Sequence, residues 1–185
     1  MHHHDRRLPH WDTVGQPLFV TFRLRGSLPR NRDFPPAHVT SGVAFVTMDR
    51  LLDQPTSGPF WLEQPRIAQL LVDALRAGET RFHRYQLHAF VIMPNHVHLL
   101  ATPHVTARGW LGPLKGFTAH ETNRILGRTG AFWQDESYDH LVRDGPQFRR
   151  IQAYIEQNPV KAGLAASAEL YPWSSAAPGQ SPAAG

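Results

Sequence analysis

The chain has 185 residues, a formal net charge of +4 and a pI of about 10.0. This length fits one domain with enough apolar residues for a core, and the basic charge suits a polyanionic partner. Arginine carries almost all of the positive charge, because Lys115 and Lys161 are the only lysines. Cysteine is absent, which excludes disulfide frameworks, thiolate metal sites and thiol nucleophiles. No apolar run could span a membrane or act as a signal peptide, so we expect a soluble cytoplasmic protein.

The spacing of apolar residues predicts alternating strands and helices. In chain order we expect a strand at 17–25, a helix at 62–77, strands at 82–93 and 96–102, a helix at 114–126, a strand at 138–142 and a helix that begins at Pro146. A further candidate strand is the apolar run 43–47. This alternation favours an α+β fold in which helices pack on one face of an antiparallel sheet. The Ser-, Ala-, Pro- and Gly-rich segment after Trp173 predicts a disordered tail.

Two histidines lie two residues apart in an apolar, β-branched stretch at 91–100. Because side chains alternate along a strand, His96 and His98 are expected on one face and Val97 on the other. Two neutral imidazoles on one face can supply two ligands to a divalent metal, and they leave room for a protein group, water or a phosphate oxygen. A His-x-His pair is more commonly solvent-facing or hydrogen-bonded, so a metal site needs support from a second element.

That second element is a predicted helix in which Gly145 resembles an N-cap and Pro146 takes the first helical position. Apolar residues recur there at helical spacing, at Phe148, Ile151 and Ile155. Tyr154 and Asn158 lie one turn apart on a shared face, so a phenol and a carboxamide could serve as nucleophile and third metal ligand. Taken alone, Tyr154 also suits a core position, and Asn158 before Pro159 suits a helix terminator.

Three stretches in this order, at 93–100, 133–140 and 154–164, resemble the motifs of the single-tyrosine HUH endonucleases. Within that group the chain is most similar to the REP-associated tyrosine transposases, and the resemblance runs from about Leu8 to Ser175. It implies one HUH domain over 8–175, followed by the predicted disordered tail at 176–185. It also implies a ferredoxin-like α+β fold, with both histidines on a central strand and Tyr154 on a helix packed beside it.

The resemblance further implies a chemistry. His96, His98 and Asn158 would hold Mg²⁺ or Mn²⁺, and Tyr154 would attack a phosphodiester and form a 5′-phosphotyrosine intermediate. The substrate would be single-stranded DNA next to a palindromic, REP-like hairpin. Candidates for DNA contact are Lys115, Arg124, Arg128, Arg143, Arg150, Lys161 and His140.

Two other classes of protein remain open at this stage. One is a metal-dependent hydrolase or nuclease with a three-histidine site of His96, His98 and His140, in which Tyr154 is structural and no covalent intermediate forms. The other is a ferredoxin-like nucleic-acid-binding module without catalysis, although the usual ribonucleoprotein signature is not evident. A monomer and a homodimer are both compatible with the sequence.

Overall fold

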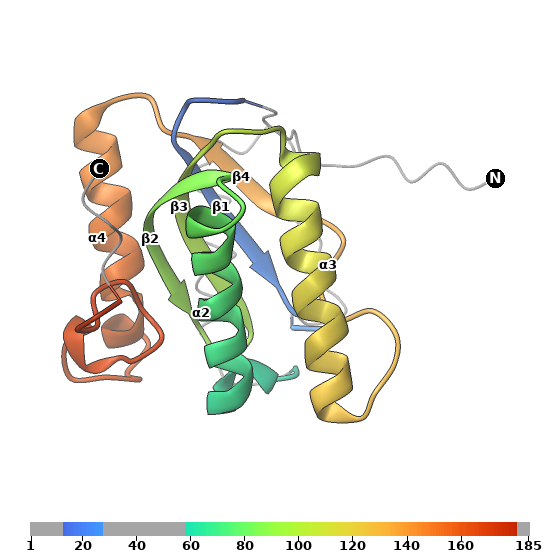
Figure 1. Cartoon of the computed structure of the whole chain (residues 1–185). Helices are drawn as coiled ribbons and strands as arrows, with labels where there is room; N and C mark the ends of the chain where they lie inside the picture. Colours follow the sequence, from blue (N-terminus) through green and yellow to red (C-terminus); the bar gives the residue numbers. More distant parts are fainter. Residues whose placement is uncertain (1–12, 28–57, 181–185) are drawn as a thin grey trace.

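The computed structural model describes residues 13–27 and 58–180, so the candidate strand at 43–47 lies outside the described residues. Figure 1 shows a sheet flanked by helices. In chain order the elements are β1 (Leu18–Arg23), the 3-10 turn η1 (Trp61–Glu63), α2 (Pro65–Thr80), β2 (Tyr85–Ile92), β3 (His96–Pro103), α3 (Ala107–Leu126), β4 (Tyr138–Leu141), α4 (Gly145–Lys161) and the 3-10 turn η2 (Ala168–Leu170). Within the described part of the chain, no helix is long and apolar enough to cross a bilayer.

The strands form one four-stranded antiparallel sheet in the order β2-β3-β1-β4. β2 and β3 form a hairpin, whereas β1 pairs with two strands that come much later in the chain. Helix α2 lies between β1 and β2 in sequence, and α3 lies between β3 and β4. This βαββαβ order with this strand order is the ferredoxin-like arrangement, so the predicted α+β class is confirmed.

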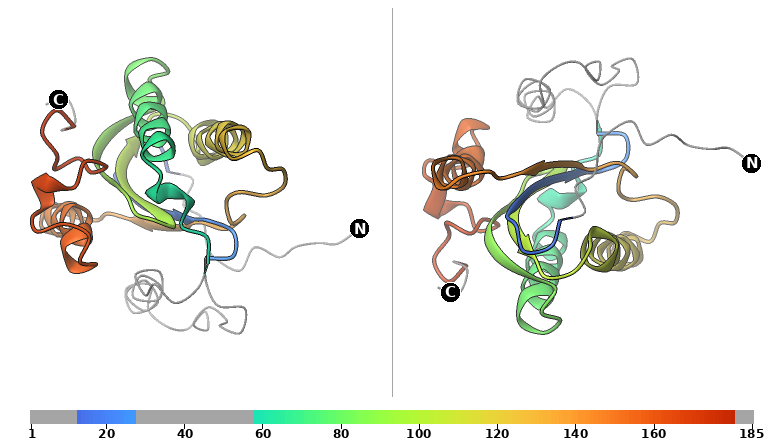
Figure 2. Two further views of the ribbon diagram at one scale, coloured as in Figure 1. Left: turned by 90° about the horizontal axis from the view of Figure 1, so that it is seen from below. Right: turned by 90° about the horizontal axis from the view of Figure 1, so that it is seen from above.

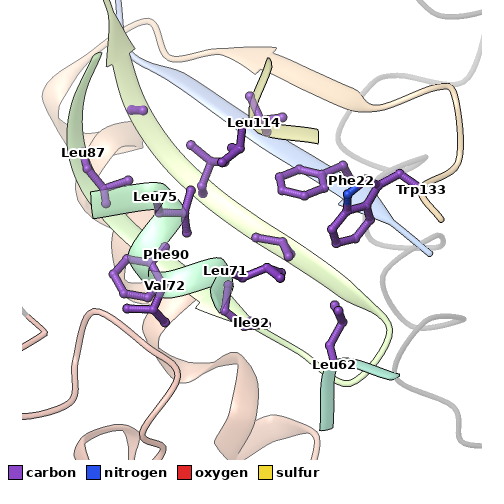
Figure 3. Close-up of a cluster of buried hydrophobic side chains, with 14 of the residues drawn as sticks. Phe22, Leu62, Leu71, Val72, Leu75, Leu87, Phe90, Ile92, Leu114 and Trp133 are labelled. Carbon is purple, nitrogen blue, oxygen red and sulfur yellow. The ribbon is translucent and has the colours of Figure 1, made fainter. Parts of the chain in front are cut away.

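The larger core lies between the sheet and helices α2 and α3, as the close-up in Figure 3 shows. Phe22 of β1 meets Trp133 edge to face, with 4.8 Å between the ring centroids. Leu71 and Leu75 lie one turn apart on α2, and both are buried against the sheet. Their spacing follows the helical repeat, which explains why the sequence pattern located this helix within a few residues.

Helix α4 packs on the opposite face of the sheet, so the expectation that the helices share one face is wrong for α4. In Figure 2, α4 lies on one side of the sheet and α2 and α3 lie on the other. The smaller core on this side contains Phe19, Leu100 and Ile155. The reason is visible in β1, whose residues are buried at every position and therefore need cover on both faces.

Helix α3 starts seven residues before the predicted residue 114, at Ala107. Gly109, Gly112 and Pro113 obscure its first turns in the sequence, because glycine and proline are the weakest helix formers. Trp110 and Leu114 are one turn apart and both are buried in the larger core. Burial of these two side chains stabilises the early turns by more than the poor propensities cost.

The C-terminal strap, residues 171–180, follows the edge of β2. The N–H of Ile92 donates to the carbonyl of Trp173 at 2.8 Å, and the N–H of Ser175 donates to the carbonyl of Phe90 at 2.9 Å. The strap thereby occupies backbone groups that an open sheet edge would expose. Ala177 is buried, so the packing continues past residue 176, where composition predicts that disorder begins.

Ser175 joins three elements through one hydroxyl. Its Oγ accepts a hydrogen bond from the N–H of Phe90 at 3.1 Å and donates to Glu156 Oε1 of α4 at 3.4 Å. We expect Ser175→Ala to lower the free energy of unfolding by roughly 1–3 kcal/mol, because a buried donor loses its acceptor. Urea denaturation measures this change. Ser174→Ala is the control, since its Oγ bonds the nearby N–H of Ala176, and an equal loss in both variants would contradict this role for Ser175.

Candidate active site

The two histidines of the 91–100 stretch lie on the central strand β3 and face α4. Val97 and Leu99 point into the larger core, whereas Leu100 points into the smaller core beneath α4. Strand alternation therefore places His96 and His98 on the α4 face, as predicted. Both imidazoles are fully buried, with 0% of each residue exposed.

The ring nitrogens of this pair have defined partners. His96 Nε2 and His98 Nε2 face each other at 3.0 Å. His96 Nδ1 lies 2.6 Å from Asn95 Oδ1, and His98 Nδ1 lies 2.7 Å from Thr21 Oγ1. Because a carboxamide oxygen can only accept, His96 Nδ1 carries a proton, so His96 Nε2 accepts the hydrogen bond that His98 Nε2 donates. Hydrogen bonds on Nδ1 that orient Nε2 are typical of imidazoles that bind metals.

The 3.0 Å between the Nε2 atoms is the length of a hydrogen bond, and it is also a separation that two ligands of one ion can have. Ligand nitrogens about 2.1 Å from one ion, at a right angle to each other, would lie about 3.0 Å apart. Among the described residues, no group of three His, Cys, Asp or Glu side chains is arranged to hold an ion. The pair therefore fits a site whose remaining ligands are of another kind, such as a carboxamide, water or a phosphate oxygen.

Tyr154 lies beside this pair. Its ring centroid is 5.8 Å from that of His98, and its ring meets Phe19 edge to face at 6.2 Å. The Lys161 Nζ lies 4.8 Å from the centroid of the Tyr154 ring, two turns further along α4. The ring of Tyr154 therefore contacts both an imidazole and an ammonium group.

Asn158 is buried and lies one turn after Tyr154 on α4, on the same side of the helix. The helix continues through Pro159 to Lys161, so Asn158 does not end it. Its N-terminus lies one residue earlier than predicted: Asp144, not Gly145, is the N-cap, and its side chain accepts from the N–H of Gln147 at 2.6 Å. The sheet and α4 therefore hold the imidazole pair, the phenol and the carboxamide on one side of the molecule.

His140 lies on the same face of the sheet as His96 and His98, but on the edge strand β4. It pairs with Phe19 in the β1–β4 register, and its Nε2 accepts from Gln147 Nε2 at 2.8 Å. Burial lowers the pKa of His140, and the nearby Arg143 lowers it further, so the ring is neutral at pH 7. The three-histidine arrangement of His96, His98 and His140 is therefore not formed by the described residues.

The predicted DNA contacts are divided between two sides of the sheet. Lys115 on α3 donates to the carbonyls of Gln134 and Asp135, and Arg124 pairs with Glu121 at 2.8 Å. Arg128 lies over the Trp61 ring at 4.0 Å from the centroid. These three belong to α3 and the residues after it, away from the histidines. Arg143 and Arg150 are exposed before and within α4, on the side of Tyr154 and Lys161.

Sequence reasoning missed the neighbours that β1 contributes to the site. The β1–β3 register places Thr21 opposite His98 and Arg23 opposite His96. Local patterns carry no signal for these contacts, because the paired strands are far apart in the chain. The contact of Asn95 with His96 could have been predicted from the sequence, because Asn95 directly precedes His96 in the motif.

The structure is similar to that of a REP-associated tyrosine transposase solved with a REP hairpin bound. The TM-score is 0.60 at 19% sequence identity, and the match covers 92% of this chain and 82% of that chain. No family model and no curated protein matches the sequence. At this identity the likeness is one of fold, and it agrees with the ferredoxin-like α+β fold that the sequence resemblance implied. This chain therefore has the fold of the REP-associated tyrosine transposases.

Proposed function

We propose that this protein cuts and rejoins single-stranded DNA through a covalent 5′-phosphotyrosine at Tyr154. The observation that supports this most directly is the imidazole pair, with 3.0 Å between the Nε2 atoms and the Tyr154 ring 5.8 Å from that of His98. A metal site and a nucleophile side by side are what transfer of a phosphodiester to a protein hydroxyl needs.

His96, His98 and Asn158 would hold Mg²⁺ or Mn²⁺. When bound, the ion supplies positive charge that neutralises the phosphate during an in-line displacement. Two imidazoles are a weak site for a hard, oxygen-preferring ion, so we expect affinity to rise when a DNA phosphate completes the ligand set. Hydrogen bonds from Thr21 to His98 Nδ1 and from His96 Nδ1 to Asn95 would fix the orientation of the rings, so that both Nε2 atoms face the ion.

Tyr154 would act on phosphorus in one balanced exchange. A bond forms between its Oη and phosphorus, the bond from phosphorus to the 3′-oxygen breaks, and the phenol proton is lost as the leaving oxygen is protonated to a 3′-hydroxyl. Lys161 would stabilise the charge on the attacking oxygen. Because the phosphotyrosine is still a phosphodiester, a 3′-hydroxyl can reverse the step and rejoin strands without ATP.

The substrate class follows from access to the phosphate. The scissile backbone must reach two buried imidazoles on the α4 face of the sheet, which is easier for a flexible strand with unpaired bases than for a rigid duplex. The structurally similar transposase was solved with a REP hairpin bound, which supports single-stranded DNA beside a palindromic hairpin as the substrate. The net charge of +4 suits such a polyanion.

The test is formation of a covalent adduct. Incubated with Mn²⁺ and an end-labelled single strand that carries a hairpin, the protein should give an SDS-resistant protein–DNA band. Tyr154→Phe should abolish that band while unfolding and DNA binding stay nearly unchanged, because only one hydroxyl is lost.

Tyr138→Phe is the control, since Tyr138 also packs against Phe19 on this face of the sheet. The same DNA sequence as a perfect duplex should give little or no adduct. DNA binding without any adduct from the wild-type protein would favour the non-catalytic module. An undiminished adduct from Tyr154→Phe would exclude Tyr154 as the nucleophile.

The histidine pair makes a second prediction. His98→Gln should lower Mn²⁺-dependent adduct formation at least roughly 100-fold and should lower the Mn²⁺ affinity of the protein–DNA complex, because one of two imidazole ligands is lost. Electron paramagnetic resonance of Mn²⁺ measures the affinity directly.

His88→Gln is a matched control, because His88 forms a similar pair with Thr102 Oγ1 at 2.7 Å on the neighbouring strands. It should leave both the adduct and Mn²⁺ affinity near wild type. Mn²⁺ affinity that is equal in His98→Gln and the wild type would refute the proposed ligand set.

A further inference from the structure

Arg23 is a buried cation next to the histidine pair, and none of the roles described above uses it. It is the last residue of β1, and the antiparallel register places it opposite His96, just as Thr21 lies opposite His98. Directly opposed residues of paired strands have Cβ atoms about 4.5–5.5 Å apart and point to the same face. The Thr21–His98 contact at 2.7 Å shows that side chains of these two strands do meet on this face.

The Arg23 guanidinium keeps its charge in a place with little water. Arg23 is 8% exposed, and Nη1 donates to Ser27 Oγ at 3.3 Å. Burial lowers the pKa of Arg23, whereas the nearby negative charge of Glu136 raises it. A guanidinium stays protonated even so. A charge in such surroundings attracts an anion more strongly than an exposed one does, because solvent screens it less.

The segment before β4 holds Glu136 near this guanidinium. The N–H of Gln134 donates to the Arg23 carbonyl at 2.8 Å, and Lys115 in turn donates to the carbonyls of Gln134 and Asp135. Glu136 follows two residues after Gln134, and its negative charge acts on the Arg23 guanidinium. A carboxylate that neutralises a binding arginine competes with any incoming phosphate for the same guanidinium.

We propose that Arg23 binds a backbone phosphate of the single-stranded DNA, at the scissile linkage or the one next to it, in competition with Glu136. This inference rests on the proposed function, since the histidine pair would bring the scissile phosphate to this face. A phosphodiester has two non-bridging oxygens, and the planar fork of arginine matches phosphate geometry better than lysine does. The position beside His96 allows Arg23 to fix the strand while Tyr154 reacts from α4.

The competition makes the two partners of the pair behave in opposite ways. Arg23→Gln should weaken binding of hairpin-flanked single-stranded DNA by roughly 10- to 100-fold, the range for a lost bond between charged groups. Glu136→Gln should strengthen binding, because the competing carboxylate is gone. If Arg23 and Glu136 only brace the loop before β4, both variants should weaken binding, or neither should change it.

The experiment measures binding by fluorescence anisotropy over a series of salt concentrations, in a Tyr154→Phe background so that no cleavage occurs. Arg23→Gln should reduce the slope of log affinity against log salt by about 0.7, the value for one lost contact with a single-strand phosphate. Arg23→Lys keeps the charge and should retain the slope with weaker binding. Arg81→Gln is the matched control, because Arg81 is exposed at the end of α2 on the other face.

A scan with neutral methylphosphonate linkages, placed one at a time, locates the phosphate on the DNA. At one position in the DNA, the neutral linkage should weaken binding to the protein that has Arg23. The same linkage should have little effect on binding to the Arg23→Gln variant. An unchanged salt slope with no such linkage would overturn the proposal, as would weaker binding by Glu136→Gln. If Arg23→Gln does not fold, the proposal is tested by the affinity of Arg23→Lys and by the linkage scan on the protein with Arg23 intact.

The outcome separates this inference from the proposed function. Adduct formation by the wild-type protein and its loss in Tyr154→Phe are measured independently of these affinities. A protein that binds through Arg23 but forms no adduct would refute the nicking activity and retain the phosphate site. If the adduct forms and all the Arg23 tests are negative, the nicking activity is retained and the phosphate site at Arg23 is refuted.

Discussion

The pairing of β1 with β3 is the contact on which the candidate site depends. It places Thr21 and Arg23 beside His98 and His96, and it makes β3 a central strand that is covered on both faces. Buried imidazoles are costly unless their nitrogens have partners, and the partners come from Thr21 and Asn95. The same bonds orient the two rings so that their Nε2 atoms lie 3.0 Å apart, at the place where we propose that an ion binds.

The second requirement is that α4 be fixed against this face. Ile155 packs in the smaller core, and the aromatic contacts among Phe19, His98 and Tyr154 hold the phenol beside the imidazoles. From the other end, Ser175 links α4 to the edge of β2 through Glu156. The proposed nucleophile therefore lies on a packed helix, where its position is better defined than it would be on a loop.

Much of this arrangement follows from local sequence patterns. Alternation predicts the strands around 82–102, and it correctly places both histidines on one face. The proline after Gly145 predicts the start of α4 to within one residue, since the helix begins at Gly145 with Asp144 as its N-cap. These features could be predicted from the sequence because side-chain periodicity and helix capping depend only on residues close together in the chain.

The remaining features depend on contacts between distant segments. Arg23 gives no local signal of its place beside His96, because that place is set by strand order and register rather than by adjacent residues. The face chosen by α4 depends on β1 being apolar on both sides. The strap at 171–180 has a composition typical of disorder, yet its backbone pairs with β2. Helix α3 begins early because burial of Trp110 outweighs the helix-breaking residues beside it.

The most direct test of the account is to identify the protein atom that carries the DNA. The adduct formed on a hairpin-flanked single strand with Mn²⁺ can be digested with protease and nuclease and sequenced by tandem mass spectrometry. The account predicts a nucleotide joined through a 5′-phosphate to Tyr154, in the peptide that contains Asn158. A nucleotide attached to another residue would contradict it, and so would cleaved DNA with no residue modified at all.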